Sequence, residues 1–295
     1  MTIKYLKHKA IDKTRWDACI ENAPNGLVYG MSWYLDIVCP GWDALVSDDY
    51  EAVMPLPWKQ KLGIKYVYHP LFAQQLGVFY QREADDQTYK FLEHIPFNFM
   101  KYDTSLNFLN HVKQLSLNIR SNYILPLNKP YNELLKTCNE NTRRNIKKAV
   151  KLNPLNTDMV ELSDFIALKR KTLAAPLKKS EIERLSTLIT YLVRNKHAKI
   201  IGVYSDKKQL LAAVCLVHYK NRLIYLFAAS SEQGKKQRSM FAVINYIMQE
   251  HASSENLIDF EGSTIDGVAR FFKGFGAVTE NYYRYKKSRI PLIKR

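Results

Sequence analysis

Short apolar runs alternate with polar segments along the chain, and the spacing within each run indicates its structure. Alternating apolar positions predict strands, and apolar positions that recur every three or four residues predict helices. In the first half, the pattern predicts strands at residues 3–9, 43–47, 50–58, 64–70 and 97–103 and helices at residues 12–23, 31–38 and 85–95. In the second half, it predicts helices at residues 161–173, 180–195, 237–251 and 264–272 and strands at residues 199–205, 210–219, 222–230, 256–262 and 281–287.

The two halves share an order of elements. Each contains a hairpin that begins at a Ser-Asp pair, Ser47-Asp48 or Ser205-Asp206, and then a strand, a helix and a strand. Such repetition predicts two copies of one α/β unit. The stretch PLNKP between Leu125 and Tyr131 supplies turn residues for the junction. We therefore expect an α/β (α+β) fold with domains at residues 1–127 and 128–295. Each would be a mixed, mostly antiparallel sheet flanked by helices, and the last strand could pack back on the first domain.

Composition narrows the class of protein. The chain has 295 residues, of which 46% are hydrophobic and 24% charged, as in globular proteins. No apolar run approaches the roughly 20 residues of a membrane span, and the N-terminus lacks the apolar core of a signal peptide, so we expect a cytoplasmic location. Four dispersed cysteines and seven dispersed histidines predict neither disulfides nor a metal site.

A net charge of +16 is the strongest signal in the composition. It favours an anionic partner such as RNA or a molecule linked to a nucleotide or phosphate. The alternative is a soluble basic protein with no such partner.

A basic stripe is predicted on a helix within residues 139–151. Its cations recur with helical spacing and fall on one side: Arg143, Arg144, Lys147, Lys148 and Lys151. Ile146, Ala149 and Val150 fall on the other side. A basic stripe backed by an apolar face suits phosphate binding, and the alternative is an ordinary solvated helix face.

A second candidate anion site lies between a predicted strand and a predicted helix that starts near Ser239. We expect a polar loop there, with Gly234 inside it and with Gln233, Lys235, Lys236 and Arg238 as anion-binding residues. A loop before a helix N-terminus can bind anions through free amides and the helix dipole.

The third candidate is the segment 256–277. Asp259 and Glu261 have strand spacing and are expected on one face, where either could act as a general base. Gly274 fits the left-handed position that ends a helix, and Lys273 would then lie in the last turn. The plain interpretation of Lys273 is a helix-end lysine that interacts with the dipole.

These segments resemble the FemABX family. The resemblance rests on RRNIKKAVK at residues 143–151, DFEGS at 259–263 and FFKGFGA at 271–277. Members of that family are aminoacyl (non-ribosomal peptidyl) transferases with two tandem GNAT-like domains. The resemblance covers about residues 131–284, and it implies the same tandem fold, with the first half matching in element order alone.

The resemblance also implies roles for residues. It associates Lys273, with Phe272 beside it, with acyl transfer and contact to the donor, and it places substrate phosphates near Arg143 and Arg144. It implies no tightly bound cofactor, with aminoacyl-tRNA or acyl-CoA as the donor substrate. Two features depart from related enzymes. No tyrosine lies between residues 262 and 277 to protonate a coenzyme A thiolate, and the chain lacks the coiled-coil insertion of some FemABX members.

The function expected from the sequence is transfer of an acyl or aminoacyl group from an activated ester or thioester to an amine. Lys273 would stabilise the oxyanion, and the basic stripe and the 233–238 segment would hold anionic substrates. Gln74, Gln75, Trp33 and Tyr34 are expected to line the cleft between the domains. One alternative is a coenzyme A-dependent N-acetyltransferase. The other is a non-catalytic basic protein of the same fold that binds RNA or a protein partner.

Overall fold

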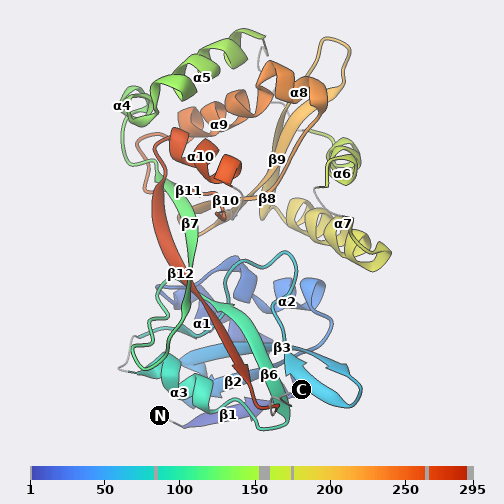
Figure 1. The fold of residues 1–295 in the computed structure, drawn as a ribbon, viewed down its shortest axis with the longest axis vertical. Helices are drawn as coiled ribbons and strands as arrows, with labels where there is room; N and C mark the ends of the chain where they lie inside the picture. Colours follow the sequence, from blue (N-terminus) through green and yellow to red (C-terminus); the bar gives the residue numbers. More distant parts are fainter. Residues whose placement is uncertain (1, 83–85, 153–159, 174–175, 263–265, 291–295) are drawn as a thin grey trace, which may run out of the picture. The chain divides into compact units, whose positions relative to one another are not determined.

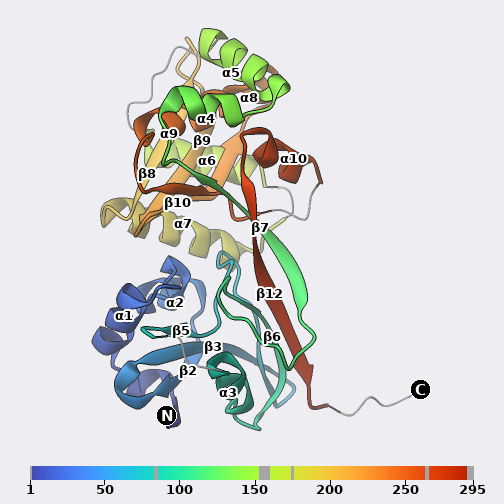
Figure 2. The same ribbon diagram turned by 90° about the vertical axis from the view of Figure 1, so that its left-hand side faces the viewer.

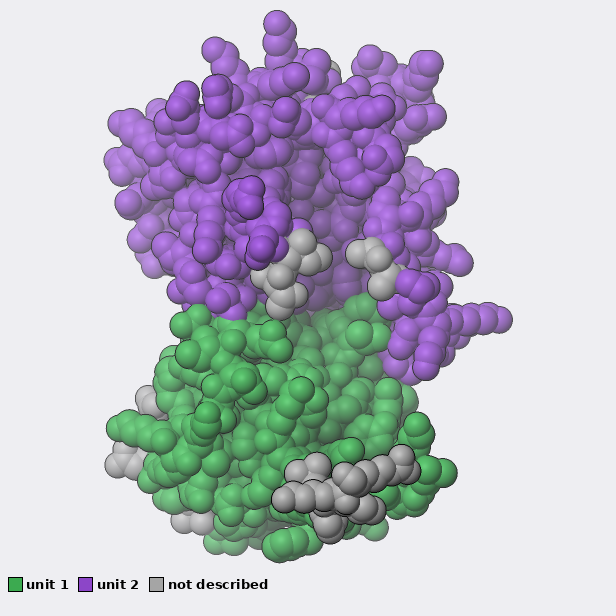
Figure 3. Space-filling view, viewed as in Figure 1, with its two compact units in different colours: residues 1–120, 281–295 green, residues 121–280 purple. Residues whose placement is uncertain are grey.

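A computed structural model describes residues 2–82, 86–152, 160–173, 176–262 and 266–290. The chain divides into two compact units (Figures 1 and 3), one made of Met1–Arg120 with Asn281–Arg295 and one of Ser121–Glu280. The division falls at residue 120, whereas the sequence-based boundary lies at 127. None of the helices described is long and apolar enough to cross a membrane.

The first unit is built on an antiparallel sheet with one parallel pair. Its strands follow the order β1-β2-β3-β4-β6-β12, with β5 paired to β3, and only β4 and β6 run parallel. The strands are β1 (Ile3–Leu6), β2 (Trp42–Ser47), β3 (Ala52–Lys61), β4 (Ile64–Val67), β5 (Phe79–Tyr80), β6 (Phe99–Leu106) and the end of β12 (Val278–Ser288). The helices are α1 (Lys13–Asn22), α2 (Ser32–Val38) and α3 (Gln87–Glu93), with short 3-10 turns η1 (His8–Ala10), η2 (Val28–Gly30) and η3 (Asp48–Tyr50).

Local sequence signals explain where these elements begin and pack. Asp12 caps α1 by accepting the backbone N–H of Arg15 at 3.1 Å. Apolar positions of the strands and of α3, among them Met54, Phe91 and Phe99, form one buried core. Tyr285 of β12 joins this core, because residues 283–288 of β12 pair with residues 101–106 of β6.

The second unit repeats the sheet-and-helix design. Its strands follow the order β7-β11-β10-β9-β8, in which β10 and β11 are parallel and the other pairs antiparallel. They are β7 (Asn118–Pro126, which begins in the first unit), β8 (Ala198–Tyr204), β9 (Leu210–Tyr219), β10 (Arg222–Ser230) and β11 (Leu257–Asp259). The helices are α4 (Tyr131–Thr137), α5 (Glu140–Leu152), α6 (Leu162–Lys171), α7 (Lys179–Arg194), α8 (Glu232–Gln237), α9 (Ser239–Glu250) and α10 (Asp266–Gly274).

The helices of the second unit cover its sheet. The apolar helix α9 packs on β8 and β9, and α5 packs on α9 (Figure 2). α6 contacts β9 and β10, and α7 contacts β8. The core joins sheet residues such as Val214 to Ile146 of α5, Ile244 of α9 and Phe272 of α10. The expected helices and strands are thus confirmed in kind and order, except that residue 85 and residues 264–265 of two expected helices lie outside the described part of the chain. The sequence analysis did not predict β5, β7, α4 or α8.

Candidate active site

The parallel strands β10 and β11 separate soon after they meet. They pair only at Arg222–Ile224 with Leu257–Asp259, whereas β10 continues along β9 to Ser230, with an irregularity between Tyr225 and Phe227. β11 turns away because the backbone N–H of Phe260 donates to the carbonyl of Tyr123 on β7, at 2.9 Å. Beyond Ile224, the β11-facing edge of β10 is therefore no longer paired with β11.

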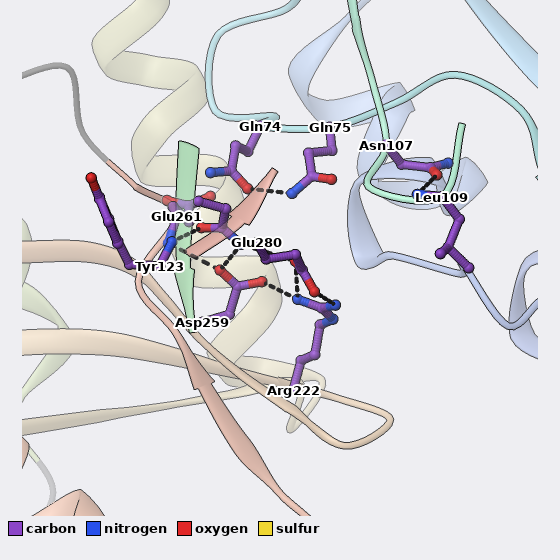
Figure 4. A network of polar contacts seen from close by, with 10 residues as sticks. Gln74, Gln75, Asn107, Leu109, Tyr123, Arg222, Asp259, Glu261 and Glu280 are labelled. Atoms are coloured by element: carbon purple, nitrogen blue, oxygen red, sulfur yellow. Dashed lines mark hydrogen bonds and ion pairs between the residues drawn. The ribbon is translucent and has the colours of Figure 1, made fainter. Parts of the chain in front are cut away.

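A buried ionic network fixes the ends of these strands (Figure 4). Arg222 begins β10 and donates to Asp259 at 2.8 Å and to both carboxylate oxygens of Glu280, at 3.0 and 2.7 Å. The side-chain amide of Asn122 donates to Asp259 at 2.9 Å and to Glu280 at 3.2 Å. Burial lowers the pKa of Arg222, but its bonds to Glu280 and the charges of Asp259 and Glu280 outweigh burial and hold that pKa above its ordinary value. Four strands, β7, β10, β11 and β12, are thereby joined through one guanidinium and its partners.

Asp259 also shapes the backbone that follows it. Its Oδ1 accepts the backbone N–H of Glu261 at 3.0 Å, and Glu261 adopts a left-handed φ of 58°. Gly262 follows at φ 69°, and a Cβ there would lie 2.1 Å from the carbonyl oxygen of Ser121. Asp259 and Glu261 are therefore not equivalent carboxylates on one strand face as expected. The first is buried and bound by three donors, and the second is partly exposed at a sharp turn.

An aromatic cluster supports Lys273. Phe272 stacks on Phe260, with ring centroids 4.4 Å apart and planes at 16°, and Tyr225 meets both rings edge-on. The next residue, Lys273, is exposed, and its Nζ lies 5.4 Å from the ring centroid of Tyr123. Because Phe272 is anchored in the core, the backbone of Lys273 has a fixed position near the end of β11.

The expectation that Gly274 is the left-handed residue ending this helix is wrong by two residues. Gly274 is the last residue of α10 and is not left-handed, and the left-handed residue is Gly276 with φ 88°. A Cβ on Gly274 would lie 2.4 Å from Oγ1 of Thr142, so this glycine permits close approach of α10 to α5.

Lys169 was missed by the sequence analysis. It lies on α6, and its ammonium donates to the carbonyl of Ala228 on β10 at 3.0 Å, within the open part of that strand. Burial lowers the pKa of Lys169, an effect that the charge of nearby Glu261 partly offsets. A pocket of about 610 Å³ adjoins this bond, between Leu168 of α6, Thr172 directly after that helix and the end of β10. The signal available in the sequence was a lysine on the inner side of an amphipathic helix.

The basic stripe lies on α5 as predicted. Arg143, Arg144, Lys147, Lys148 and Lys151 are all exposed. Arg143 already uses part of its guanidinium inside the protein, because it donates to the carbonyls of Cys138 and Lys136 at the end of α4. Arg144 forms only a long, exposed contact to Glu140, at 3.9 Å. Val150, expected on the apolar side, is exposed instead, and the buried face is completed by Asn145 and Thr142.

The expected anion-binding loop at residues 233–238 is wrong, because this segment is helical. Ser231 caps α8 by accepting the backbone N–H of Gly234 at 3.0 Å, and Arg238 adopts a left-handed φ of 61° between α8 and α9. A Cβ on Gly234 would lie 2.1 Å from the carbonyl oxygen of Leu211, so this glycine packs against β9. Lys235 pairs with Glu232 at 2.6 Å on the surface. The remaining candidates, Gln233 and Lys236, lie on α8.

The candidates from the first half all lie in the first unit. Tyr34 is buried in α2 and its hydroxyl donates to the carbonyl of Phe72, which ties α2 to the loop that carries Gln74 and Gln75. Trp33 packs edge-on against Tyr34, with ring centroids 5.6 Å apart. The side-chain amide of Gln75 donates to Gln74 at 2.8 Å. The structure thus brings these four residues near one loop. Among the described residues, no group of His, Cys, Asp and Glu is arranged to hold a metal ion.

Solved structures match the chain along almost its whole length. The crystal structure of FemX has a TM-score of 0.68 at 13% identity and covers 96% of this chain and 97% of that chain. L-PGS from Bacillus licheniformis has a TM-score of 0.57 at 10% identity, with 95% and 92% covered. A tandem GNAT protein from the clavulanic acid biosynthesis pathway has a TM-score of 0.54 at 8% identity, with 98% and 99% covered.

The likeness is one of fold. No protein-family model matches the chain, and no curated protein matches its sequence. The structural matches confirm the two-domain GNAT-like fold expected from the sequence.

Proposed function

We propose that the protein transfers an acyl or aminoacyl group from an activated ester or thioester to an amine, in the manner of FemABX enzymes. The observation that carries the proposal is the placement of Lys273. It extends from a helix anchored through Phe272, whose ring stacks on Phe260 directly after β11, and its Nζ lies 5.4 Å from the ring centroid of Tyr123 on β7. Similarity of the whole chain to FemX and to a tandem GNAT protein supports this assignment.

The reaction needs an unprotonated amine, alignment of two reactants and stabilisation of an oxyanion. The amine nitrogen attacks the carbonyl carbon, and the bond from that carbon to the donor's oxygen or sulfur breaks. Lys273 supplies positive charge to the developing oxyanion or to the leaving atom. The proton released by the amine passes to a base at the site.

Glu261 suits the role of that base better than Asp259. All three hydrogen bonds to Asp259 come from groups that are themselves fixed, and the carboxylate is buried. Glu261 is partly exposed at the turn after β11 and acts electrostatically on Lys169. In this scheme Asp259 is a positioning residue, which holds the turn that presents Glu261.

We favour a donor carried on RNA. The exposed cations of α5 suit a phosphate backbone, and the segment that would bind a coenzyme A pyrophosphate is a short helix whose glycine faces Leu211. Gln233 and Lys236 on this helix, and Arg238 directly after it, are proposed to contact the donor. Trp33, Tyr34, Gln74 and Gln75 are proposed to contact the acceptor, and the protein is proposed to act in the cytoplasm without a resident cofactor.

The test is a donor panel. The full chain would be incubated with bulk aminoacyl-tRNA labelled in the amino acid, or with labelled acyl-coenzyme A, in the presence of UDP-linked muropeptide as the amine acceptor. Melting temperatures would be measured in parallel, because a ligand that binds the native state raises them. We expect label to move from aminoacyl-tRNA and that donor to stabilise the fold. Transfer only from acyl-coenzyme A would select the N-acetyltransferase alternative, and RNA-induced stabilisation without transfer would select the binding protein.

A further inference from the structure

The tip of the β3–β4 hairpin presents an apolar side chain in an unfavourable backbone conformation. Lys61 pairs with Ile64 around a two-residue turn of Leu62 and Gly63, whose φ values are 50° and 76°. Turns of this type favour Asn, Asp or Gly at the first position. Leu62 nevertheless occupies it, and the residue is 91% exposed. Neither turn geometry nor packing explains a leucine here, which points to a partner outside the unit.

A second exposed apolar side chain lies at the same end of these strands. Because β4 and β6 are parallel and Lys65 pairs with Phe99, the residues just before β6 lie beside the start of β4. Phe97 is among them and is 84% exposed. Its position is fixed, since the Arg289 guanidinium lies 4.6 Å from its ring centroid and donates to the carbonyls of Pro96, Phe99 and Ile95.

Lysines surround these apolar side chains. Lys59 pairs with Tyr66, and Tyr66 pairs with Lys101 on β6, so the three side chains form a row on one face of three adjacent strands. Lys61 follows Lys59 at strand spacing on the same face. Lys59, Lys61 and Lys101 are exposed, and within the described ranges none of them forms an ion pair with an acidic residue.

We propose that the surface at this end of β3, β4 and β6 docks on an anionic lipid surface. We call it the strand-end surface, and it is formed by Lys59, Lys61, Leu62, Ile64, Phe97 and Lys101. Lysines bind the anionic headgroups, and Leu62 and Phe97 enter the boundary between headgroups and acyl chains. The separate apolar tips, with nearby lysines that have no acidic partner among the described residues, suit a lipid interface better than a flat protein interface, which needs a contiguous apolar centre. Docking is independent of the transfer chemistry, because none of these residues belongs to the candidate active site.

The test is cosedimentation of the full chain with vesicles of phosphatidylcholine, with and without one third phosphatidylglycerol. We expect binding only to the anionic vesicles. Leu62→Asn should weaken it about five-fold or more while keeping the fold, since Asn accepts the left-handed conformation better than Leu. The double variant Lys59→Ser/Lys61→Ser should weaken it about ten-fold or more.

Matched controls separate the effect of the strand-end surface from the effects of total charge and of exposed apolar side chains elsewhere. Leu152→Asn on α5 removes another exposed leucine, and Lys147→Ser/Lys148→Ser removes the same charge from the basic stripe. Both should leave vesicle binding within about two-fold of the parent chain. Equal losses in test and control variants would show binding through overall charge and overturn the proposal. So would a loss of RNA binding, rather than of vesicle binding, in the Lys59→Ser/Lys61→Ser variant.

Discussion

Phe272 and Phe260 stack face to face, with ring centroids 4.4 Å apart. Phe260 directly follows β11, and Phe272 directly precedes Lys273, so this one contact ties the candidate catalytic lysine to the point where the sheet opens. The arrangement makes the position of Lys273 a consequence of core packing. It also separates two properties that can be measured independently, the stability of the unit and the chemistry of the lysine.

Replacing Arg222 by Met should destabilise the protein strongly. The change leaves Asp259 and Glu280 buried without their cation, and breaking a buried ion pair on one side costs about 3–5 kcal/mol. Urea denaturation would measure the free energy of unfolding. Arg144→Met is the matched control, since its exposed contact to Glu140 should contribute no more than about 0.5 kcal/mol. Similar losses in the two variants would contradict a structural role for the network.

Gly234→Ala should destabilise the fold by roughly 1–3 kcal/mol, because the new Cβ would collide with the backbone of β9. Gly267→Ala on α10 has no atom within 4 Å of its Cβ and should stabilise the helix by about 0.5–1 kcal/mol. Thermal unfolding of both variants checks this. If Gly234→Ala is neutral, the close approach of Gly234 to β9 does not contribute to stability.

Partly buried His69 should make stability depend on pH. Burial and the charge of Arg284 lower the pKa of His69 to about 4, below the ordinary 6.5 of an unfolded histidine. As the pH falls from 6.5 towards 4, the unfolded state binds a proton that the folded state does not, so stability is lost in that window, by roughly 3 kcal/mol in total. His69→Gln should flatten this part of the profile of unfolding free energy against pH. An unchanged slope would mean that His69 is protonated in the folded protein.

The stripe on α5 should set the salt dependence of RNA binding. Removing two phosphate contacts with Lys147→Ser/Lys148→Ser should reduce the slope of log affinity against log salt by about 1.4–1.8, from single-stranded to duplex RNA. Filter binding of bulk tRNA across a salt series measures that slope. The variant Lys59→Ser/Lys61→Ser loses the same charge in the first unit and should retain the parental slope. Equal reductions would assign RNA binding to net charge alone.

Element types were predictable from the sequence because apolar spacing reports locally on which side of a segment is buried. The helix at α8 also had a local signal, since Ser231 and Glu232 are a good cap and first-turn residue, although Gly234 and the polar residues around it are typical of a loop. The distinction between Gly274 and Gly276 depended on how closely α10 approaches α5, which local spacing does not contain.

The ionic network could not be predicted from the sequence, for a different reason. Arg222, Asp259 and Glu280 are separated by tens of residues, and only strand order brings them together. An arginine opening an apolar strand was the one local hint. Lys273 and Phe272 were found through a motif, whereas Lys169 could be recognised only once α6 was seen against the open edge of β10.

The most direct test of the account is the transfer rate of the Lys273→Met variant with labelled aminoacyl-tRNA as donor. We expect the rate to fall about 100-fold or more, because the charge at the oxyanion is lost. The free energy of unfolding should change by no more than about 0.5 kcal/mol, since the side chain is exposed. Arg270→Met, which removes a second exposed cation from α10, should keep the parental rate. Transfer by Lys273→Met at the parental rate would contradict the account and leave Lys273 as a helix-end lysine.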